Sequence, residues 1–155
     1  MSVTDANFNQ FHLFGLNFNS ELPFAEQVPA TGDIDVDIHY GKLSEHLNGR
    51  TAVESGFQIA PGKVLFNIDG IGRIAVCHGK EIIVDPLKGV SEGELSQALL
   101  SSVMGALLHQ RGSFPFHGSA VEIGNECILF TGSSGSGKST TAALFYTRGY
   151  RLLAE

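Results

Sequence analysis

The residues with the clearest potential for chemistry form the segment GSSGSGKST at positions 132–140. Its first eight residues have the spacing G-x-x-x-x-G-K-S, which is typical of a P-loop that surrounds the phosphates of a nucleotide with backbone N–H groups. We take the whole segment as the candidate cofactor-binding set: Gly132, Ser133, Ser134, Gly135, Ser136, Gly137, Lys138, Ser139 and Thr140.

Each of these residue types suits a bound triphosphate. The glycines allow the backbone to aim successive N–H groups inward, because they carry no Cβ atom, and a helix that starts at the loop adds the positive end of its macrodipole. Lys138 would place a positive charge at the β- and γ-phosphates, and the hydroxyl of Ser139 would ligate Mg²⁺. Thr140 would help to position a phosphate. The segment therefore predicts a nucleotide site that uses Mg²⁺.

The flanking sequence has the order of elements that a P-loop requires. Two apolar runs surround Gly124-Asn125, which predicts a β-hairpin whose second strand, residues 127–130, leads into the loop. The segment KSTTAALFYTRG then predicts a helix that ends at Gly149, and YRLLAE begins another strand. Right-handed crossover geometry would make the strands before and after this helix parallel. Three helix residues should face inward: Ala142, Ala143 and Phe145.

The first 90 residues have the pattern of a β-rich part. FHLFGLNFNSELPF and DIDVDIHYG alternate apolar and polar residues, as half-buried strands do. From Gly56 onward, short apolar runs between turn residues predict a β-meander. We therefore expect an α/β protein, α+β overall, with a β-rich N-terminal domain at residues 1–90 and the N-terminal part of a P-loop domain at residues 91–155.

Residues 91–112 predict a long amphipathic helix. Ser91 and Glu94 have the pattern of a capping box, and Gly112 marks the expected end of the helix. His109 should cap carbonyl groups or lie at the surface. One apolar stripe would face the core: Leu95, Leu99, Leu100, Val103, Met104, Leu107 and Leu108.

Composition limits the classes of function. With 43% hydrophobic residues, the 155-residue chain can bury a core and should be globular. A net charge of −6 without a dense Lys/Arg run argues against nucleic acid as a partner, and no apolar run approaches the roughly 18 residues of a membrane span. Cys77 and Cys127 lie in apolar runs without metal-type spacing, which predicts buried thiols in a reducing compartment. We expect a cytoplasmic protein.

Asp33, Asp35 and Asp37 alternate along a predicted strand. Period-2 spacing places them on one face of that strand. The glycine and the distal glutamate of a calcium loop are missing from the pattern. We predict a solvated face here and not a metal site.

From about Val64 onward, the chain resembles the HPr kinase/phosphorylase superfamily, especially its smaller HPr-kinase-like members found beside peptide-modification genes. The resemblance is carried by LLHQRGSFPFHGSAVEIG and GSSGSGKSTTAALFYTRGYRLLAE. In that family a His-Gly or His-Ala-Ser segment forms the strand before the P-loop, and Lys-Ser or Lys-Thr closes the loop. This sequence has His117-Gly118-Ser119 and Lys138-Ser139 at those places.

The resemblance implies a P-loop kinase domain of the HPr kinase type that uses ATP and Mg²⁺ to phosphorylate a serine of a peptide or small protein. His117 would be the family's phosphate-side histidine and a catalytic residue close to the γ-phosphate. The alternative for His117 is a hydrogen-bonded histidine at the start of a strand. Arg111 and Arg148 are expected to be macrodipole partners and not phosphate ligands.

In that family an aspartate after LLA acts as the general base. The sequence ends at Glu155, where that aspartate would come next, so we expect a fragment, either a truncated gene product or one part of a split protein. Glu155 is itself a candidate substitute for the first acidic residue. An incomplete sheet would leave a strand edge unpaired, which favours association into a homo-oligomer.

Two other functions stay open. The chain could bind nucleotide without catalysis and act as a regulatory or partner-binding module, and the missing acid favours this. It could also be a different P-loop phosphotransferase or NTPase, such as a small-molecule kinase. A leader peptide or carrier protein bound by the β-rich part would favour the peptide kinase over the small-molecule kinase.

Overall fold

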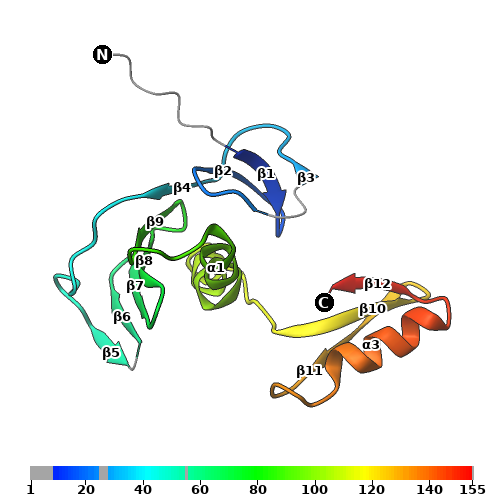
Figure 1. Ribbon diagram of the computed structural model, residues 1–155. Helices are drawn as coiled ribbons and strands as arrows, with labels where there is room; N and C mark the ends of the chain where they lie inside the picture. Colours follow the sequence, from blue (N-terminus) through cyan, green and yellow to red (C-terminus); the bar gives the residue numbers. More distant parts are fainter. Residues whose placement is uncertain (1–8, 25–27, 55, 155) are drawn as a thin grey trace. The chain divides into compact units, whose positions relative to one another are not determined.

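The computed structural model describes residues 9–24, 28–54 and 56–154, which form a mixed α+β protein with a large β-sheet (Figure 1). The chain divides into two compact units between Ser113 and Phe114. The sequence pattern placed a division at residues 90 and 91, but the helical segment that follows residue 91 packs into the core of the first unit. We describe each unit by itself.

The first unit contains a nine-stranded sheet with the order β3-β1-β2-β4-β9-β8-β7-β6-β5. The pairs β2–β4 and β4–β9 are parallel, and the other pairs are antiparallel. The predicted meander is confirmed as β6 to β9. The strands are β1 (Asn9–Leu13), β2 (Leu16–Ser20), β3 (Val28–Pro29), β4 (Val36–Tyr40), β5 (Ala52–Glu54), β6 (Phe57–Ala60), β7 (Lys63–Ile68), β8 (Gly72–Cys77) and β9 (Glu81–Pro86).

The opening apolar segment forms a hairpin of two strands, β1 and β2, where the sequence pattern suggested one strand. Phe14 and Gly15 turn the chain with φ of 52° and 76°, and two positive φ values in succession are the mark of a tight hairpin turn. The second predicted strand is confirmed as β4, whose Val36 and Ile38 are fully buried.

The helical segment starts and ends where the sequence predicts. Ser91 and Glu94 form the capping box at the start of α1 (Glu92–Ala98). At the end of α2 (Met104–Gln110), Gly112 has a φ of 80° and donates to the His109 carbonyl, while Ser113 N–H donates to the Leu108 carbonyl. This pair of hydrogen bonds is a Schellman motif, which satisfies carbonyls that a helix end would leave without a partner.

The helical segment is interrupted in its middle, where the sequence predicted one long helix. A wider π-helical turn, η1 (Leu99–Val103), separates α1 from α2, and Ser101 has non-helical φ and ψ of −94° and −128°. The Ser101 hydroxyl donates to the Ala98 carbonyl at 2.6 Å. Serine side chains compete in this way with the hydrogen bonds of a helix, which accounts for the break.

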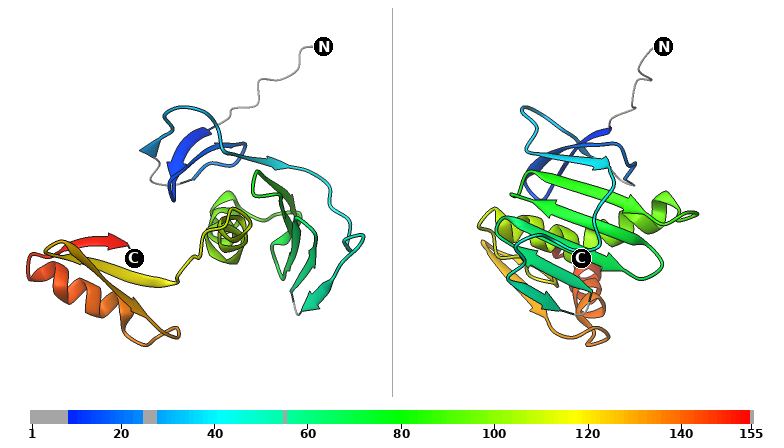
Figure 2. Two further views of the ribbon diagram at one scale, coloured as in Figure 1. Left: turned by 180° about the vertical axis from the view of Figure 1, so that it is seen from behind. Right: turned by 90° about the vertical axis from the view of Figure 1, so that its left-hand side faces the viewer.

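The main core lies between the helical segment and the sheet, which curves around it (Figures 1 and 2). The apolar stripe is confirmed except at Leu100, whose side chain is 47% exposed. Leu100 lies about 100° of helical rotation from the fully buried Leu99, on the side of the helix that also carries the exposed Gln97 and Ser101, so its side chain stays at the margin of the stripe. The buried residues are Phe11, Phe18, Leu22, Phe24, Val36, Ile38, Ile74, Val76, Ile82, Val84, Leu95, Leu99, Val103, Met104 and Leu107.

A smaller core on the other face of the sheet holds Leu65, Ala75 and Cys77, against which Leu43 and Leu47 pack. The predicted burial of the Cys77 thiol is confirmed, and this burial raises its pKa. Gln58, on β6, holds the loop that contains Leu43 and Leu47. The Gln58 amide donates to the Glu45 carbonyl at 2.8 Å and accepts from Leu47 N–H at 3.0 Å.

The second unit is a three-stranded sheet with the order β11-β10-β12 and one helix, α3 (Lys138–Thr147). The strands are β10 (Gly118–Ile123), β11 (Glu126–Thr131) and β12 (Arg151–Ala154). The predicted hairpin is confirmed, because β10 pairs with β11 around Gly124-Asn125. Both β11 and β12 are antiparallel to β10, so they run in the same direction, as predicted, with β10 between them.

Two expectations about burial in the second unit are wrong. Cys127 is exposed, because it lies on β11 at the edge of the sheet, where nearly every residue has solvent access. Ala143 on α3 is also exposed, whereas Ala142 is fully buried, and Phe145 packs its ring against Phe130 and Tyr150.

In the described part of the chain, the helices are too short or too polar to cross a membrane.

The hydrogen bonds of the Asp85 carboxylate allow a prediction of how the stability of the first unit depends on pH. Its carboxylate is nearly buried and accepts from Lys42 Nζ at 2.8 Å and from Leu43 N–H at 3.1 Å, and these bonds lower the pKa of the carboxyl. A carboxyl whose pKa is lower in the folded state stabilises the fold above its unfolded pKa of about 3.9. That stabilisation is lost as the pH falls through the folded pKa.

We therefore expect the free energy of unfolding of the unmodified protein to fall more steeply between about pH 5 and pH 2 than that of Asp85→Asn. Urea unfolding at a series of pH values measures this difference. Glu54→Gln, on the exposed strand β5, is the matched control and should keep the steep dependence. Identical pH profiles for Asp85→Asn and the unmodified protein would contradict the role of this carboxylate.

Candidate nucleotide-binding site

The loop between β11 and α3 has the backbone conformation that the glycine spacing predicts. Gly132, Gly135 and Gly137 have φ of 151°, 79° and 86°, a region that side chains disfavour. A Cβ atom at Gly132 would also lie 2.9 Å from the Ser136 hydroxyl. The loop closes on itself through Ser136 N–H, which donates to the Ser133 carbonyl at 3.2 Å.

The loop delivers the chain to the N-terminus of α3. Gly137 is the N-cap in a left-handed conformation, and none of its neighbours caps the helix with a side chain. Because the first N–H groups of a helix lack intrahelical acceptors, they can donate to a ligand that lies in front of α3. The positive end of the helix macrodipole favours an anion at the same place.

Lys138 places its ammonium group inside the loop. Nζ donates to the carbonyls of Gly132 and Ser133, at 3.0 Å in both cases. The salt bridges among the described residues do not involve Lys138, whose hydrogen-bond partners there are these two carbonyls. An anionic ligand would therefore meet an ammonium group with which no carboxylate of residues 9–24, 28–54 and 56–154 pairs.

The remaining predicted residues leave the site open to solvent. Four serines and one threonine of the loop region are exposed: Ser133, Ser134, Ser136, Ser139 and Thr140. The described residues contain no group of three or more His, Cys, Asp or Glu side chains that could hold a metal ion by itself. A single hydroxyl, such as that of Ser139, fits Mg²⁺ that keeps phosphate oxygens and water as its other ligands.

His117 is exposed and directly precedes β10. Gly118 pairs with Thr131, so His117 and Gly132 leave the hairpin at the same end. Figures 1 and 2 show β10 and β11 side by side in this hairpin. A Cβ atom at Gly118 would lie 2.5 Å from the Phe130 carbonyl oxygen, so the two strands approach closely there. Within the described residues, the His117 side chain makes no hydrogen bond, and its catalytic role stays a prediction.

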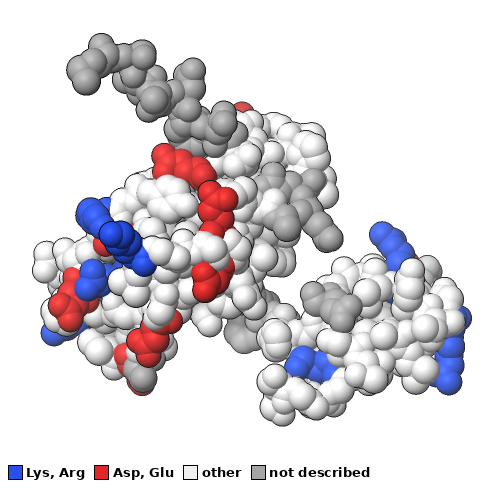
Figure 3. Space-filling view, in the orientation of Figure 1, with Lys and Arg blue, Asp and Glu red and all other residues white. Residues whose placement is uncertain are grey.

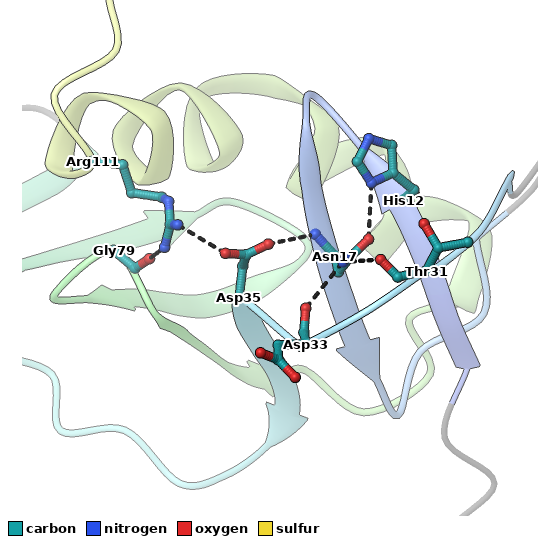
Figure 4. Close-up of polar contacts among 7 residues, drawn as sticks. All are labelled: His12, Asn17, Thr31, Asp33, Asp35, Gly79 and Arg111. Carbon is teal, nitrogen blue, oxygen red and sulfur yellow. Dashed lines mark hydrogen bonds and ion pairs between the residues drawn. The ribbon is translucent and has the colours of Figure 1, made fainter.

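A polar cluster in the first unit involves two residues considered above, Asp35 and Arg111 (Figure 4). Asp35 accepts from the Asn17 N–H at 2.9 Å and from the Arg111 guanidinium at 3.1 Å. Arg111 also donates to the Gly79 carbonyl at 2.8 Å. The Asn17 amide donates in turn to the Thr31 and Asp33 carbonyls.

This cluster joins β2, the segment before β4, the turn between β8 and β9, and the end of α2. The prediction of a solvated face is confirmed for Asp33 and Asp37, which are exposed, and only in part for Asp35, whose side chain is 35% exposed and pairs with Arg111. Arg111 binds Asp35 and Gly79 and does not serve the helix dipole alone. Residues 76 positions apart form this pair, so no local sequence pattern could have found it.

Charged side chains of both signs are interspersed on the face of the first unit that Figure 3 shows. The described residues of the second unit carry three basic residues, Lys138, Arg148 and Arg151, and two acidic ones, Glu122 and Glu126. Arg151 pairs with Glu122 at 3.2 Å. Arg148 is exposed beyond the end of α3. Among these three basic residues, Lys138 is the one whose charged group contacts the loop.

The close approach at Gly118 predicts the effect of a single methyl group. Gly118→Ala should destabilise the protein by about 1–3 kcal/mol, because a Cβ atom must push β10 away from the Phe130 carbonyl beside the loop. Gly105→Ala is the matched control, since open space surrounds that helical position, and it should stabilise by about 0.5–1 kcal/mol. Urea unfolding measures both changes, and a neutral Gly118→Ala would contradict the close packing.

We compared the chain with models of protein families, with curated proteins and with solved structures, and none of the three comparisons finds a match. The assignment of a function therefore depends on the geometry of the loop and on the motifs at His117-Gly118-Ser119 and Lys138-Ser139.

Proposed function

We propose that the chain binds ATP as part of an HPr-kinase-like protein, which transfers the γ-phosphoryl group to a serine hydroxyl of a protein or peptide. One observation carries the proposal: Lys138 Nζ lies between two loop carbonyls at the N-terminus of α3, in a loop whose three glycines have positive φ. The proposal includes Mg²⁺ as a cofactor and a cytoplasmic location.

Each residue of the loop would contribute to phosphate binding. The N–H groups that begin α3 would donate to phosphate oxygens. Lys138 would exchange its two carbonyl acceptors for oxygens of the β- and γ-phosphates. The Ser139 hydroxyl would face Mg²⁺, which neutralises phosphate charge when bound. Phosphoryl transfer depends mainly on such positioning and charge stabilisation.

His117 would act at the γ-phosphate. It leaves β10 at the end of the hairpin where the loop begins, and its imidazole is exposed. A histidine at this place could donate a hydrogen bond to a phosphate oxygen or move a proton at neutral pH. The acceptor would be a serine of a peptide or small protein.

A second candidate function is nucleotide binding without catalysis, in a regulatory or partner-binding module. The positions of the carboxylates favour it. Among the described residues of the second unit, Glu122 pairs with Arg151 and Glu126 begins β11 beside the hairpin turn, at the end opposite to the loop. Glu155, the candidate substitute for the general base, lies outside the described residues. β11 and β12 are the edge strands of the three-stranded sheet. Unpaired edge strands are compatible with a homo-oligomer for both candidate functions.

Lys138→Ala tests the nucleotide site. Mg·ATP should raise the melting temperature of the unmodified protein, because a ligand that binds only the folded state stabilises it, by about 2.7 kcal/mol at a concentration of 100 Kd. Lys138→Ala should abolish this increase. Lys88→Ala, which removes an exposed lysine of the first unit, is the matched control and should keep it.

A melting temperature that Mg·ATP leaves unchanged in the unmodified protein, or raises equally in Lys138→Ala, would contradict nucleotide binding at the loop. Incubation with ATP labelled at the γ-phosphate separates the two candidates. Label on a serine of a protein or peptide supports the kinase, and binding without any transfer supports the module.

A further inference from the structure

Phe114 and Phe116 form an exposed aromatic pair on the segment that leads into β10. Their side chains are 75% and 64% exposed, and Phe114 has the highest exposure of any large hydrophobic residue in the described part of the chain. The ring centroids lie 5.2 Å apart with an angle of 59° between the ring planes. Single exposed apolar residues are common, but two aromatic rings in contact with each other and with solvent indicate a surface that binds something.

The pairing of β10 with β11 places this pair beside the loop. Phe116 lies two residues before Gly118, whose partner in the sheet is Thr131, the residue before Gly132. An extended chain advances about 3.3 Å per residue, so the backbone of Phe116 lies within about 7 Å of the end of the hairpin and that of Phe114 within about 13 Å. The ribose and the α-phosphate separate a nucleobase from phosphates held by Lys138. A base site should therefore lie near the loop but outside it.

We propose that Phe114 and Phe116 form a platform on which the nucleobase of the bound nucleotide stacks. The inference rests on the proposed nucleotide site and adds the residues that hold the base. Aromatic side chains bind bases through the π-face that every base has. Pro115, between the two phenylalanines, fixes its own φ and restricts Phe114, which reduces the entropy lost when the rings are held in place.

The platform should bind purine nucleotides without strong selection among them. Stacking does not read the hydrogen-bonding groups on the edge of a base. ATP and GTP should therefore bind with affinities within a few fold of each other.

The test compares Mg·ATP with Mg·tripolyphosphate, which has phosphates but no base, by titration calorimetry of the intact chain. In the double variant Phe114→Ala/Phe116→Ala, the affinity for Mg·ATP should fall roughly tenfold to a hundredfold, while the affinity for Mg·tripolyphosphate stays the same. The double variant Phe114→Tyr/Phe116→Tyr should bind Mg·ATP about as tightly as the unmodified protein, because tyrosine rings also stack on a base. Tyr146→Ala removes an equally exposed aromatic ring from α3 and should change neither affinity.

Four results would overturn the inference. Unchanged affinity of the double alanine variant for Mg·ATP would show that the rings do not hold the base. An equal loss of affinity for both ligands, or failure of the tyrosine variant to restore binding, would assign the rings to support of the loop. If the unmodified protein fails to bind Mg·tripolyphosphate and Mg·ATP alike, the proposed function itself is wrong, and the base platform with it.

Discussion

The pairing of β10 with β11 determines where every part of the candidate site lies. Gly118 is opposite Thr131, and the backbones approach so closely that the Phe130 carbonyl occupies the place of a side chain at Gly118. This register sends His117 and the first loop glycine out of the same end of the hairpin. A shift of one residue would turn alternate side chains to the other face and would displace the loop from His117.

The loop follows directly from this hairpin and carries the features on which the proposed phosphate site depends. The glycines of the loop have positive φ values, which residues with side chains disfavour, and α3 begins at Lys138. The lysine ammonium, which two loop carbonyls hold, stays available to a ligand of opposite charge. The helix N-terminus, the glycine conformations and the lysine are each compatible with the ligand that we propose, a nucleotide phosphate.

The first unit owes its organisation to contacts between residues distant in the sequence. Gln110 and Arg111, at the end of α2, bind the backbone at Gly79 and so fix the helical segment to the turn between β8 and β9. Arg111 extends the same connection to Asp35 and, through it, to Asn17. The helical segment therefore belongs to the first unit, because its apolar stripe and its polar end both contact that sheet.

Local sequence patterns correctly predicted the turns and helix ends that depend only on neighbouring residues. The turn at Gly124-Asn125, the capping box at Ser91 and the stop at Gly112 depend on neighbouring residues, and all three are confirmed. The exposure of Cys127 depends on the place of β11 at the sheet edge, which no local pattern contains. The Asp35–Arg111 pair and the parallel insertion of β4 between β2 and β9 likewise depend on tertiary structure.

The conformation of the loop was easier to predict from the sequence than the positions of the residues around it. The spacing of Gly132, Gly137 and Lys138 encodes the loop directly, because backbone conformation and charge are set by those residues themselves. The position of His117 relative to the loop required the register of β10 and β11. The exposure of Phe114 and Phe116 required knowledge of what packs against them.

The most direct test of the central claim is a titration of the ¹⁵N-labelled protein with Mg·ATP, followed through its amide resonances. If the loop holds phosphate in backbone N–H groups, the amide signals of residues 132–140 should move first and furthest, and those of β6 to β9 should stay in place. Unchanged signals from residues 132–140 at saturating Mg·ATP, or changes confined to the first unit, would contradict the claim.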